Sequence, residues 1–450
     1  MENLSAPSAE QTAPGTGAGS EEWALPDDIH TVELVVGDSS GLLRGKRIPR
    51  SMWRRVANNG IALAGVLFEW SPCCDIREDA PYSNMENGVP DIRIVPMLET
   101  LRVLPWQDGT ARVLCEAREP DGSAVRVDPR RALLKVLDSY AELGYQVKAG
   151  VEFEFYLLDP ETRQPRQSAT QCYGVTHAPL YEGVLTAIRN LLNDYGIPVE
   201  ASNLEYAPGQ VEVNLLYGDA LEAADASVQF RSAVKEIAAR EGWLASFMAK
   251  PFEGESGSGM HVHYSLWQGE ENSFADGEAL SQVGSHFLGG LQRHMPALTL
   301  FGSPTANGMK RRIDYSFCPT TASWGGDNRT VGLRVIDGEE DATRIEQRDG
   351  AADCNPYLAM AAQLSAGLDG INGRIEPGPR CEGDAYSSDA DASLPRTVPE
   401  AIGALASSEL ARETFDSMLL ETFVGFCRFE HEKVTGAVTE LERERYLEAF

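Results

Sequence analysis

The chain has 450 residues, of which 42% are hydrophobic, and carries a formal net charge of −29. Its length accommodates one large or two moderate domains with a sizeable core, and its acidity argues against nucleic acid or an anionic membrane as a partner. Eight scattered cysteines without a CxxC pair, no cleavable leader and no long apolar run favour a cytoplasmic protein with reduced thiols.

The N-terminal quarter of the chain is expected to comprise a tail and a small domain. Residues 1–24 are rich in Ala, Ser, Gly, Pro and Glu, a composition typical of a disordered tail. Residues 25–122 are predicted to form a small α+β domain. Its expected strands and single short helix are, in chain order, 31–36, 42–48, 51–59 (the helix), 92–106 and 111–116.

Residues 123–450 are predicted to form a large α+β catalytic domain with an antiparallel sheet. Its expected helices are 128–143, 183–195, 220–241, 278–294, 355–369 and 431–449. Its expected strands are 146–158, two segments within 198–216, and 243–249. Neither GxGxxG nor GxxxxGK[ST] occurs, which argues against a Rossmann fold and against a P-loop.

The segment KPFEGESGSGMHVHYS, from Lys250 to Ser265, joins a glycine-containing loop to an alternating strand. Alternation places His261, His263 and Ser265 on one face, and the preceding glycines allow the backbone to approach a ligand closely. Two histidines at this spacing are more often ordinary strand residues than ligands. The acids elsewhere in the chain therefore decide how this segment is interpreted.

Two pairs of glutamates are candidates to complete a cation site. Glu152 and Glu154 alternate with apolar residues in GVEFEF, so they share one strand face, and burying both is unfavourable unless a cation compensates. Glu205 and Glu212 flank the turn APG, which can bring them to the same end of a sheet. Solvated acids on a half-exposed strand and on a surface hairpin are the alternatives.

Arginines surround a fifth acid near the C-terminal third of the chain. Arg344, Glu346 and Arg348 alternate, so a carboxylate between two guanidinium groups would stay ionised, and the arginines could bind an anion. An exposed ladder of ion pairs would give the same pattern. Further candidates for anion binding are Arg329, Arg334 and Lys310–Arg312.

Five acids and one histidine are hard ligands that suit Mg²⁺ or Mn²⁺ rather than zinc. Divalent ions together with arginines neutralise the phosphates and the charge that develops during phosphoryl transfer. The residues by themselves therefore indicate a nucleotide-using enzyme that lacks a P-loop.

At this point the motifs resemble those of the glutamine synthetase family, over about residues 30–450. The resemblance rests on GVEFEF (150–155), the two glutamates around APGQVE (205–212), KPF…SGSGMHVHYS (250–265), NGMKRR (307–312), WGGDNR (324–329) and RIEQRDGAADCNPYLAMAA (344–362). It implies a small N-terminal β-grasp-like domain before the catalytic domain. It also implies a homo-oligomer, a dodecamer of two hexameric rings with active sites between subunits.

The resemblance assigns roles to residues at the matching positions. It implies two sets of metal ligands, one of Glu154, Glu205 and Glu212 and a second, beside the γ-phosphate, of Glu152, His261 and Glu346. Nucleotide-binding positions are His263, Ser265, Arg334 and Arg344. Glutamate-binding positions are Gly257, Arg311 and Arg348, and catalytic positions are Arg329, Glu346 and Arg348. The implied cofactors are two to three Mg²⁺ or Mn²⁺ ions, with ATP and glutamate as substrates.

The chain departs from the family pattern on the side that receives the amine. Ammonia-using members have a glutamate two residues before a proline at the position of Phe317, and a phenyl ring can neither pair with ammonium nor accept its proton. A ring can pack the carbon chain of an amine and attract its charge. The usual N-terminal aspartate is also missing, and Glu69 and Trp70 are the nearest candidates for this amine pocket. Ser256 stands where an asparagine is common.

These departures resemble the branch of the family that makes γ-glutamyl amides of organic amines. They predict a ligase that joins glutamate to a polyamine, ethanolamine or a small alkylamine through γ-glutamyl phosphate. The alternatives are an ammonia-using glutamine synthetase in which Phe317 only packs, an inactive scaffold on the same fold, and a hydrolase. Tyr386 lies in a loop resembling one that is adenylylated in some members, but its neighbours give no reason to expect modification.

Overall fold

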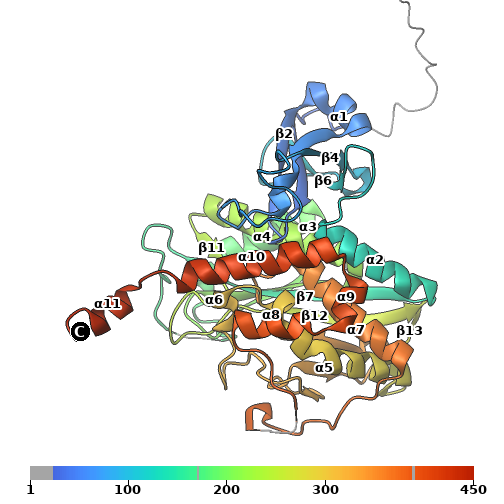
Figure 1. Cartoon of the computed structure of the whole chain (residues 1–450), viewed down its shortest axis with the longest axis vertical. Helices are drawn as coiled ribbons and strands as arrows, with labels where there is room; N and C mark the ends of the chain where they lie inside the picture. The colour runs from blue at the N-terminus through green and yellow to red at the C-terminus, as the bar shows by residue number, and fades with distance from the viewer. Residues whose placement is uncertain (1–23, 170–171, 388–390) are drawn as a thin grey trace, which may run out of the picture.

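The computed structural model describes residues 24–169, 172–387 and 391–450. The tail predicted for residues 1–24 therefore lies, apart from its last residue, outside the described part of the chain. Figure 1 shows a small N-terminal part, in blue, next to a larger body in which helices cover a central sheet. Among the described helices, none is both long and apolar enough to span a membrane.

The smaller part contains a six-stranded sheet with one helix, α1 (Trp53–Asn59), beside it. Its strands run in the order β2 (Leu43–Pro49), β1 (Thr31–Gly37), β6 (Thr110–Arg118), β4 (Asp91–Pro96) and β3 (Ile61–Ala64), and β5 (Arg102–Val103) also pairs with β6. Among the described strands of this sheet, β1 and β6 pair in parallel and the other pairs are antiparallel. The single strand predicted for 92–106 is wrong. Strand β4 ends at Pro96, because proline has no N–H to donate to the strand ladder, and a 3₁₀ turn and the short strand β5 follow.

The larger part is organised around a ten-stranded sheet. The main path is β16 (Trp324–Gly325), β17 (Leu333–Ile336), β18 (Arg344–Gln347), β12 (Met260–Gln268), β7 (Gln146–Leu158), β9 (Gln210–Leu215) and β8 (Val199–Leu204). The short strands β10 (Gly218–Asp219) and β11 (Leu244–Ser246) pair with β7, and β13 (Glu271–Asn272) pairs with β12. Every pairing except that of β16 with β17 is antiparallel, so the predicted α+β architecture with an antiparallel sheet is confirmed. A separate hairpin joins β14 (Ala275–Asp276) and β15 (Ala279–Leu280).

Helices cover this sheet and extend to the C-terminus. They are α2 (Pro129–Glu142), α3 (Ala178–Tyr195), α4 (Ala220–Arg240), α5 (Gln282–Gly302), α6 (Ala306–Met309), α7 (Pro356–Gly373), α8 (Val398–Ala406), α9 (Glu409–Thr414), α10 (Ser417–Thr435) and α11 (Glu440–Tyr446). The predicted helix 431–449 is wrong, because α10 ends at Thr435 and a new helix begins after the Thr439 cap. Helices α6, α8 and α9 and most of α10 were not predicted from the sequence.

The two faces of β7 differ: one packs in the hydrophobic core and the other carries acidic side chains. Phe153 stacks on Phe230 of α4 with ring centroids 5.0 Å apart, and Phe155 packs against Phe247 at 4.9 Å. Because side chains alternate along a strand, this apolar packing turns Glu152 and Glu154 to the opposite face. The hydrophobic core on one side of the sheet therefore fixes where the acids lie on the other.

Candidate active site

Strand register brings the acids and histidines together. In the pairing of β12 with β7, His261 lies opposite Glu152, and in the pairing of β7 with β9, Glu154 lies opposite Glu212. Directly opposite residues have Cβ atoms about 5 Å apart. Three neighbouring strands thus place these four side chains on one patch of the sheet.

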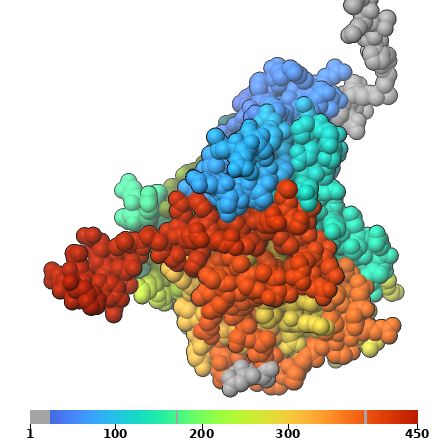
Figure 2. Space-filling view, in the orientation of Figure 1, coloured from blue at the N-terminus to red at the C-terminus, as the bar shows by residue number. Residues whose placement is uncertain are grey.

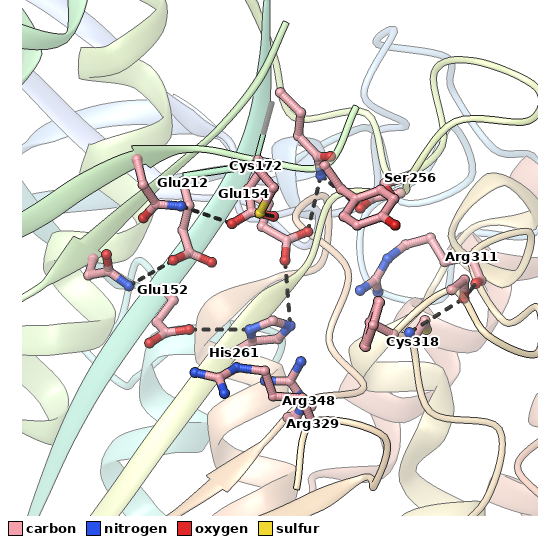
Figure 3. Close-up of a pocket in the computed structure, with 18 of the residues that line it drawn as sticks. Glu152, Glu154, Cys172, Glu212, Ser256, His261, Arg311, Cys318, Arg329 and Arg348 are labelled. Atoms are coloured by element: carbon pink, nitrogen blue, oxygen red, sulfur yellow. Dashed lines mark hydrogen bonds and ion pairs between the residues drawn. The ribbon is translucent and has the colours of Figure 1, made fainter. Parts of the chain in front are cut away.

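A cavity of about 590 Å³ opens over this patch (Figure 3). Acids line one end, namely Glu152, Glu154, Glu205 and Glu212, together with His261. The rest of the wall includes four arginines, at positions 311, 329, 334 and 348, and three aromatic residues, Tyr173, Tyr206 and Phe317. The cavity therefore combines an acidic end, cationic groups and an aromatic wall.

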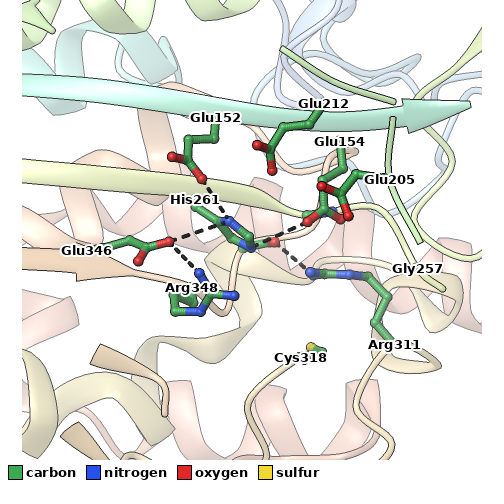
Figure 4. A network of polar contacts seen from close by, with 12 residues as sticks. Glu152, Glu154, Glu205, Glu212, Gly257, His261, Arg311, Cys318, Glu346 and Arg348 are labelled. Carbon is green, nitrogen blue, oxygen red and sulfur yellow. Dashed lines mark hydrogen bonds and ion pairs between the residues drawn. The ribbon is translucent and has the colours of Figure 1, made fainter. Parts of the chain in front are cut away.

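His261 is the centre of the acidic end (Figure 4). Its Nδ1 lies 3.3 Å from a carboxylate oxygen of Glu152 and 3.6 Å from one of Glu346, and its Nε2 lies 3.9 Å from Glu154. Burial alone would raise the pKa of Glu152, but hydrogen bonds from His261 and His263 outweigh burial and hold that pKa well below its usual range. Glu152 is therefore an anion in this arrangement.

Glu212 and Glu205 have too little positive charge around them within the protein. Burial, with the neighbouring carboxylates Glu152, Glu154 and Glu205, raises the pKa of Glu212 to about 9. Burial and the charge of Glu154 raise the pKa of Glu205 to about 7. A divalent cation would supply the missing positive charge, so the donor set fits Mg²⁺ or Mn²⁺.

The structure groups the candidate ligands somewhat differently from the two predicted sets. One group whose donor atoms lie within 4.8 Å of one another is Glu152, Glu212 and His261, and a second is Glu152, His263 and Glu346. His263, predicted to bind nucleotide, has its Nε2 3.1 Å from Glu152 and so joins the second group. Glu152 lies between both groups and can serve either.

Glu346 is held between two arginines, as predicted, but they are Arg348 and Arg334 instead of Arg348 and Arg344. Arg348 donates to Glu346 at 2.5 Å and Arg334 at 3.1 Å. The charge of Arg348, with those of His263 and His261, outweighs burial and lowers the pKa of Glu346 to about 2. Arg344 instead donates to Nδ1 of His263 at 3.3 Å, because register places Arg334 of β17 directly opposite Glu346.

The predicted nucleotide-binding residues line an adjoining cavity of about 340 Å³. His263, Ser265 and Arg344 belong to its wall, whereas Arg334 lines the first cavity. Glu152 lines both cavities, so the acidic end lies where they meet. This arrangement can place a phosphate chain beside the candidate metal ligands.

Gly257 and Arg311, predicted to hold glutamate, lie against each other in the first cavity. A Cβ added to Gly257 would lie 2.5 Å from Cγ of Arg311 and 2.8 Å from the carbonyl oxygen of Ala249, so only glycine fits. Arg311 is buried and donates to the carbonyl of Gly350 at 2.7 Å. The close approach keeps this guanidinium in the cavity wall.

Of the three residues predicted for the amine pocket, only Phe317 lies in the cavity. Its side chain is half exposed and its backbone has φ of 58°, a conformation that non-glycine residues rarely adopt. Glu69 is buried elsewhere: it accepts hydrogen bonds from the Tyr82 amide at 2.8 Å and from Thr422 at 3.0 Å, and lies 3.5 Å from Arg77. Within one chain, Glu69 and Trp70 line none of the cavities described above.

Several lining residues were missed by sequence reasoning. Gln210 and Asn214 alternate with Glu212 along β9, so the period of two could have identified them, and Gln210 donates to the carbonyl of Gly257 at 3.0 Å. Tyr173 and Tyr206 lie outside regular elements and left no periodic signal. Other missed lining residues are Cys172, Asn203, Ser316 and Cys318.

Comparison with known proteins agrees with this geometry. Residues 126–446 match the glutamine synthetase catalytic domain. The chain is 36% identical over 441 residues to a glutamate–isopropylamine ligase from Pseudomonas sp., covering 94% of this chain and 95% of that protein. It is 35% identical over 453 residues to a glutamine synthetase from Halobacterium salinarum, and the match covers 95% of this chain and 97% of that protein. A solved structure described as a GmaS/ADP complex has a TM-score of 0.84 at 32% identity, covering 94% of this chain and 97% of that chain. The chain belongs to the glutamine synthetase family.

Proposed function

We propose that the chain is a ligase that uses ATP to join the γ-carboxylate of glutamate to an organic primary amine. The observation that carries the proposal is Phe317, an aromatic side chain facing a cavity whose acids and arginines are otherwise those of a phosphoryl-transfer site. One relative is named a glutamate–isopropylamine ligase, and another of nearly equal sequence identity is named a glutamine synthetase. Sequence identity alone therefore does not identify the amine that this chain uses.

In the first step, an oxygen of the glutamate γ-carboxylate attacks the γ-phosphorus of ATP. The bond from that phosphorus to the β,γ-bridging oxygen breaks, ADP leaves and γ-glutamyl phosphate forms. Arg329 and Arg348 line the cavity where the transferred group would lie, and their positive charge would stabilise its negative charge. Arg334 and Arg348 keep Glu346 ionised through direct contacts.

The six proposed metal ligands are Glu152, Glu154, Glu205, Glu212, His261 and Glu346. Bound Mg²⁺ or Mn²⁺ ions would supply neutralisation of the phosphate charges. Gly257 and Arg311 would hold the glutamate, and His263, Ser265 and Arg344 would hold the nucleotide in the adjoining cavity. A GmaS/ADP complex among the similar structures supports nucleotide binding by this fold.

In the second step, the amine nitrogen attacks the acyl carbon of γ-glutamyl phosphate. The bond from that carbon to the phosphate oxygen breaks, phosphate leaves, and the nitrogen passes a proton to the departing phosphate or to solvent water. Phe317 and Tyr206, whose ring centroids are 6.3 Å apart, form an aromatic surface at this end of the cavity. Such a surface packs the carbon of an amine and attracts its charged form, but it offers no carboxylate to hold ammonium.

The test is phosphate release by the purified protein with ATP, Mg²⁺ and glutamate, using ammonium, methylamine, isopropylamine, ethanolamine, putrescine, spermidine and aniline in turn. We expect strong turnover with at least one organic amine and little with ammonium. Turnover best with ammonium would instead establish a glutamine synthetase, and ATP binding without turnover of any acceptor would favour an inactive scaffold. Reactions without glutamate control for simple ATP hydrolysis.

We also propose that the chain assembles into a homo-oligomeric ring with active sites between subunits. The apolar side chains exposed on the C-terminal segment support assembly, among them Leu441, Leu447 and Phe450. A neighbouring subunit could then present Trp70, which lies away from the cavity of its own chain.

A further inference from the structure

A third cavity, of about 550 Å³, opens beside the first one and is called here the side cavity. Phe317 and Arg329 line both cavities, so the side cavity begins at the residue proposed to face the amine. The first cavity alone would suffice for a small amine. The side cavity therefore offers room for an amine that extends beyond the reacting nitrogen.

The walls of the side cavity are two loops that hydrogen bonds tie together. The Asn328 side chain donates to the carbonyl of Gly383 at 2.7 Å, and Thr330 donates to the same oxygen at 3.1 Å. The Tyr386 hydroxyl donates to the carbonyl of Cys318 at 3.1 Å. These contacts join the segment before Pro319 to the loop around residue 384, so the cavity has fixed walls.

The lining combines aromatic rings with one acid that has no basic partner. Tyr315 and Tyr386 have ring centroids 5.2 Å apart, and Phe317 lies on the same wall. Glu382 is 3.3 Å from Arg380, and Asp327 is 2.5 Å from Arg334. Asp384 forms no ion pair with any described residue; its Oδ1 accepts only the amide of Tyr386, at 3.0 Å.

We propose that the side cavity binds the far end of a diamine or polyamine. The carbon chain would pack on Phe317 and Tyr315, and the second ammonium group would meet Asp384 and the faces of the tyrosine rings. This inference rests on the proposed ligase function and adds the class of amine. Asp384 takes the place of Glu69 as the acid of the amine pocket, because Glu69 already pairs with Arg77 and accepts a hydrogen bond from Thr422.

The test compares butane-1,4-diamine with butan-1-amine, which has the same carbon chain and lacks the second ammonium group. We expect the wild-type protein to show kcat/KM about two- to fivefold higher for the diamine, the size of effect that one partly exposed ion pair provides. Asp384→Asn should remove this preference through a higher KM for the diamine and leave the monoamine unchanged. Asp384 is exposed, so the change should not disturb folding.

Asp314→Asn is the matched control, since Asp314 carries the same charge, pairs with Arg396 at 3.1 Å and does not line the side cavity. An equal effect of Asp384→Asn on both amines, or a wild-type preference for butan-1-amine, would overturn the inference while leaving the ligase function intact. Failure of every organic amine to support phosphate release would overturn the ligase function, and the inference with it.

Discussion

At the scale of single residues, the amine side of the cavity depends on Phe317. Its ring is half exposed although it is apolar, and its backbone has φ of 58°. Both features are unfavourable for folding, and such residues persist where the surrounding structure and function require them. Phe317 is therefore the position at which a single substitution should change the choice of acceptor.

We expect Phe317→Glu to raise kcat/KM for ammonium about tenfold and to lower it for organic amines by a similar factor. A carboxylate at this position attracts ammonium and can accept its proton, whereas the loss of the ring removes packing for carbon. Steady-state phosphate release with both acceptors measures the change. Phe317→Leu serves as the control, because it is apolar and should not gain activity with ammonium; no gain in the glutamate variant would contradict the assignment.

We expect Glu212→Gln to weaken Mn²⁺ binding by about 10- to 100-fold, since it removes one anionic donor from a cluster that needs a cation. Isothermal titration calorimetry of the purified protein with Mn²⁺ measures this affinity without an activity assay. The exposed Glu241, at the end of α4, provides the control substitution Glu241→Gln. Unchanged affinity in Glu212→Gln would remove Glu212 from the ligand set.

At the scale of elements, the N-terminus of α2 stabilises the start of the larger part through a buried acid. Asp128 caps the helix by accepting the Arg130 amide at 2.9 Å, with Pro129 at the first helical position. Burial outweighs these hydrogen bonds and raises the pKa of Asp128 to about 6. The folded carboxyl group thus binds its proton more tightly than the unfolded one.

Because its folded pKa is raised, Asp128 favours unfolding increasingly as pH rises from about 4 to 6. Asp128→Asn keeps the capping oxygen and cannot ionise. We therefore expect the stability of this variant, relative to wild type, to increase between pH 4 and pH 7 by roughly 2 kcal/mol and then to stay constant. Thermal unfolding at several pH values measures it, and a pH-independent difference would contradict the raised pKa.

At the scale of the whole molecule, the C-terminal segment lies apart from the body (Figure 2). Every residue from Glu432 to Phe450 is exposed, although α11 has a complete capping box at Thr439 and Glu442. A helix with exposed apolar side chains and a well-formed cap is expected to pack on another subunit. This is the part of the chain that assembly would bury.

We expect the full chain to form an assembly of twelve 49.0-kDa subunits, about 590 kDa, and a variant that ends at Gly436 to form smaller species. Light scattering after size-exclusion chromatography measures both masses. Circular dichroism should show that the shortened chain still folds, since the removed residues are all exposed. An unchanged mass would show that α11 does not hold the assembly together.

The sequence by itself determined the local pattern of the site. Alternation in GVEFEF, MHVHYS and RIEQR put the acids and histidines on single strand faces, and turn residues around APG marked a hairpin. Strands β7, β9, β12 and β18 could therefore be predicted together with most of their functional side chains. Period-two patterning is a property of neighbouring residues, and a sequence displays it directly. Helix α2 was predictable to within one residue at each end for the same reason, from Asp128-Pro129 and Gly144.

Only the tertiary structure decided which of these side chains meet. Arg334 rather than Arg344 contacts Glu346, and His263 rather than His261 completes the second ligand group, because strand register between distant segments sets these distances. Glu69 accepts a hydrogen bond from Thr422, which is 353 residues away, and forms an ion pair with Arg77. The side cavity arises where the loops around Phe317 and Asp384 come together. Contacts of this kind depend on packing between segments far apart in the chain, and no local pattern encodes them.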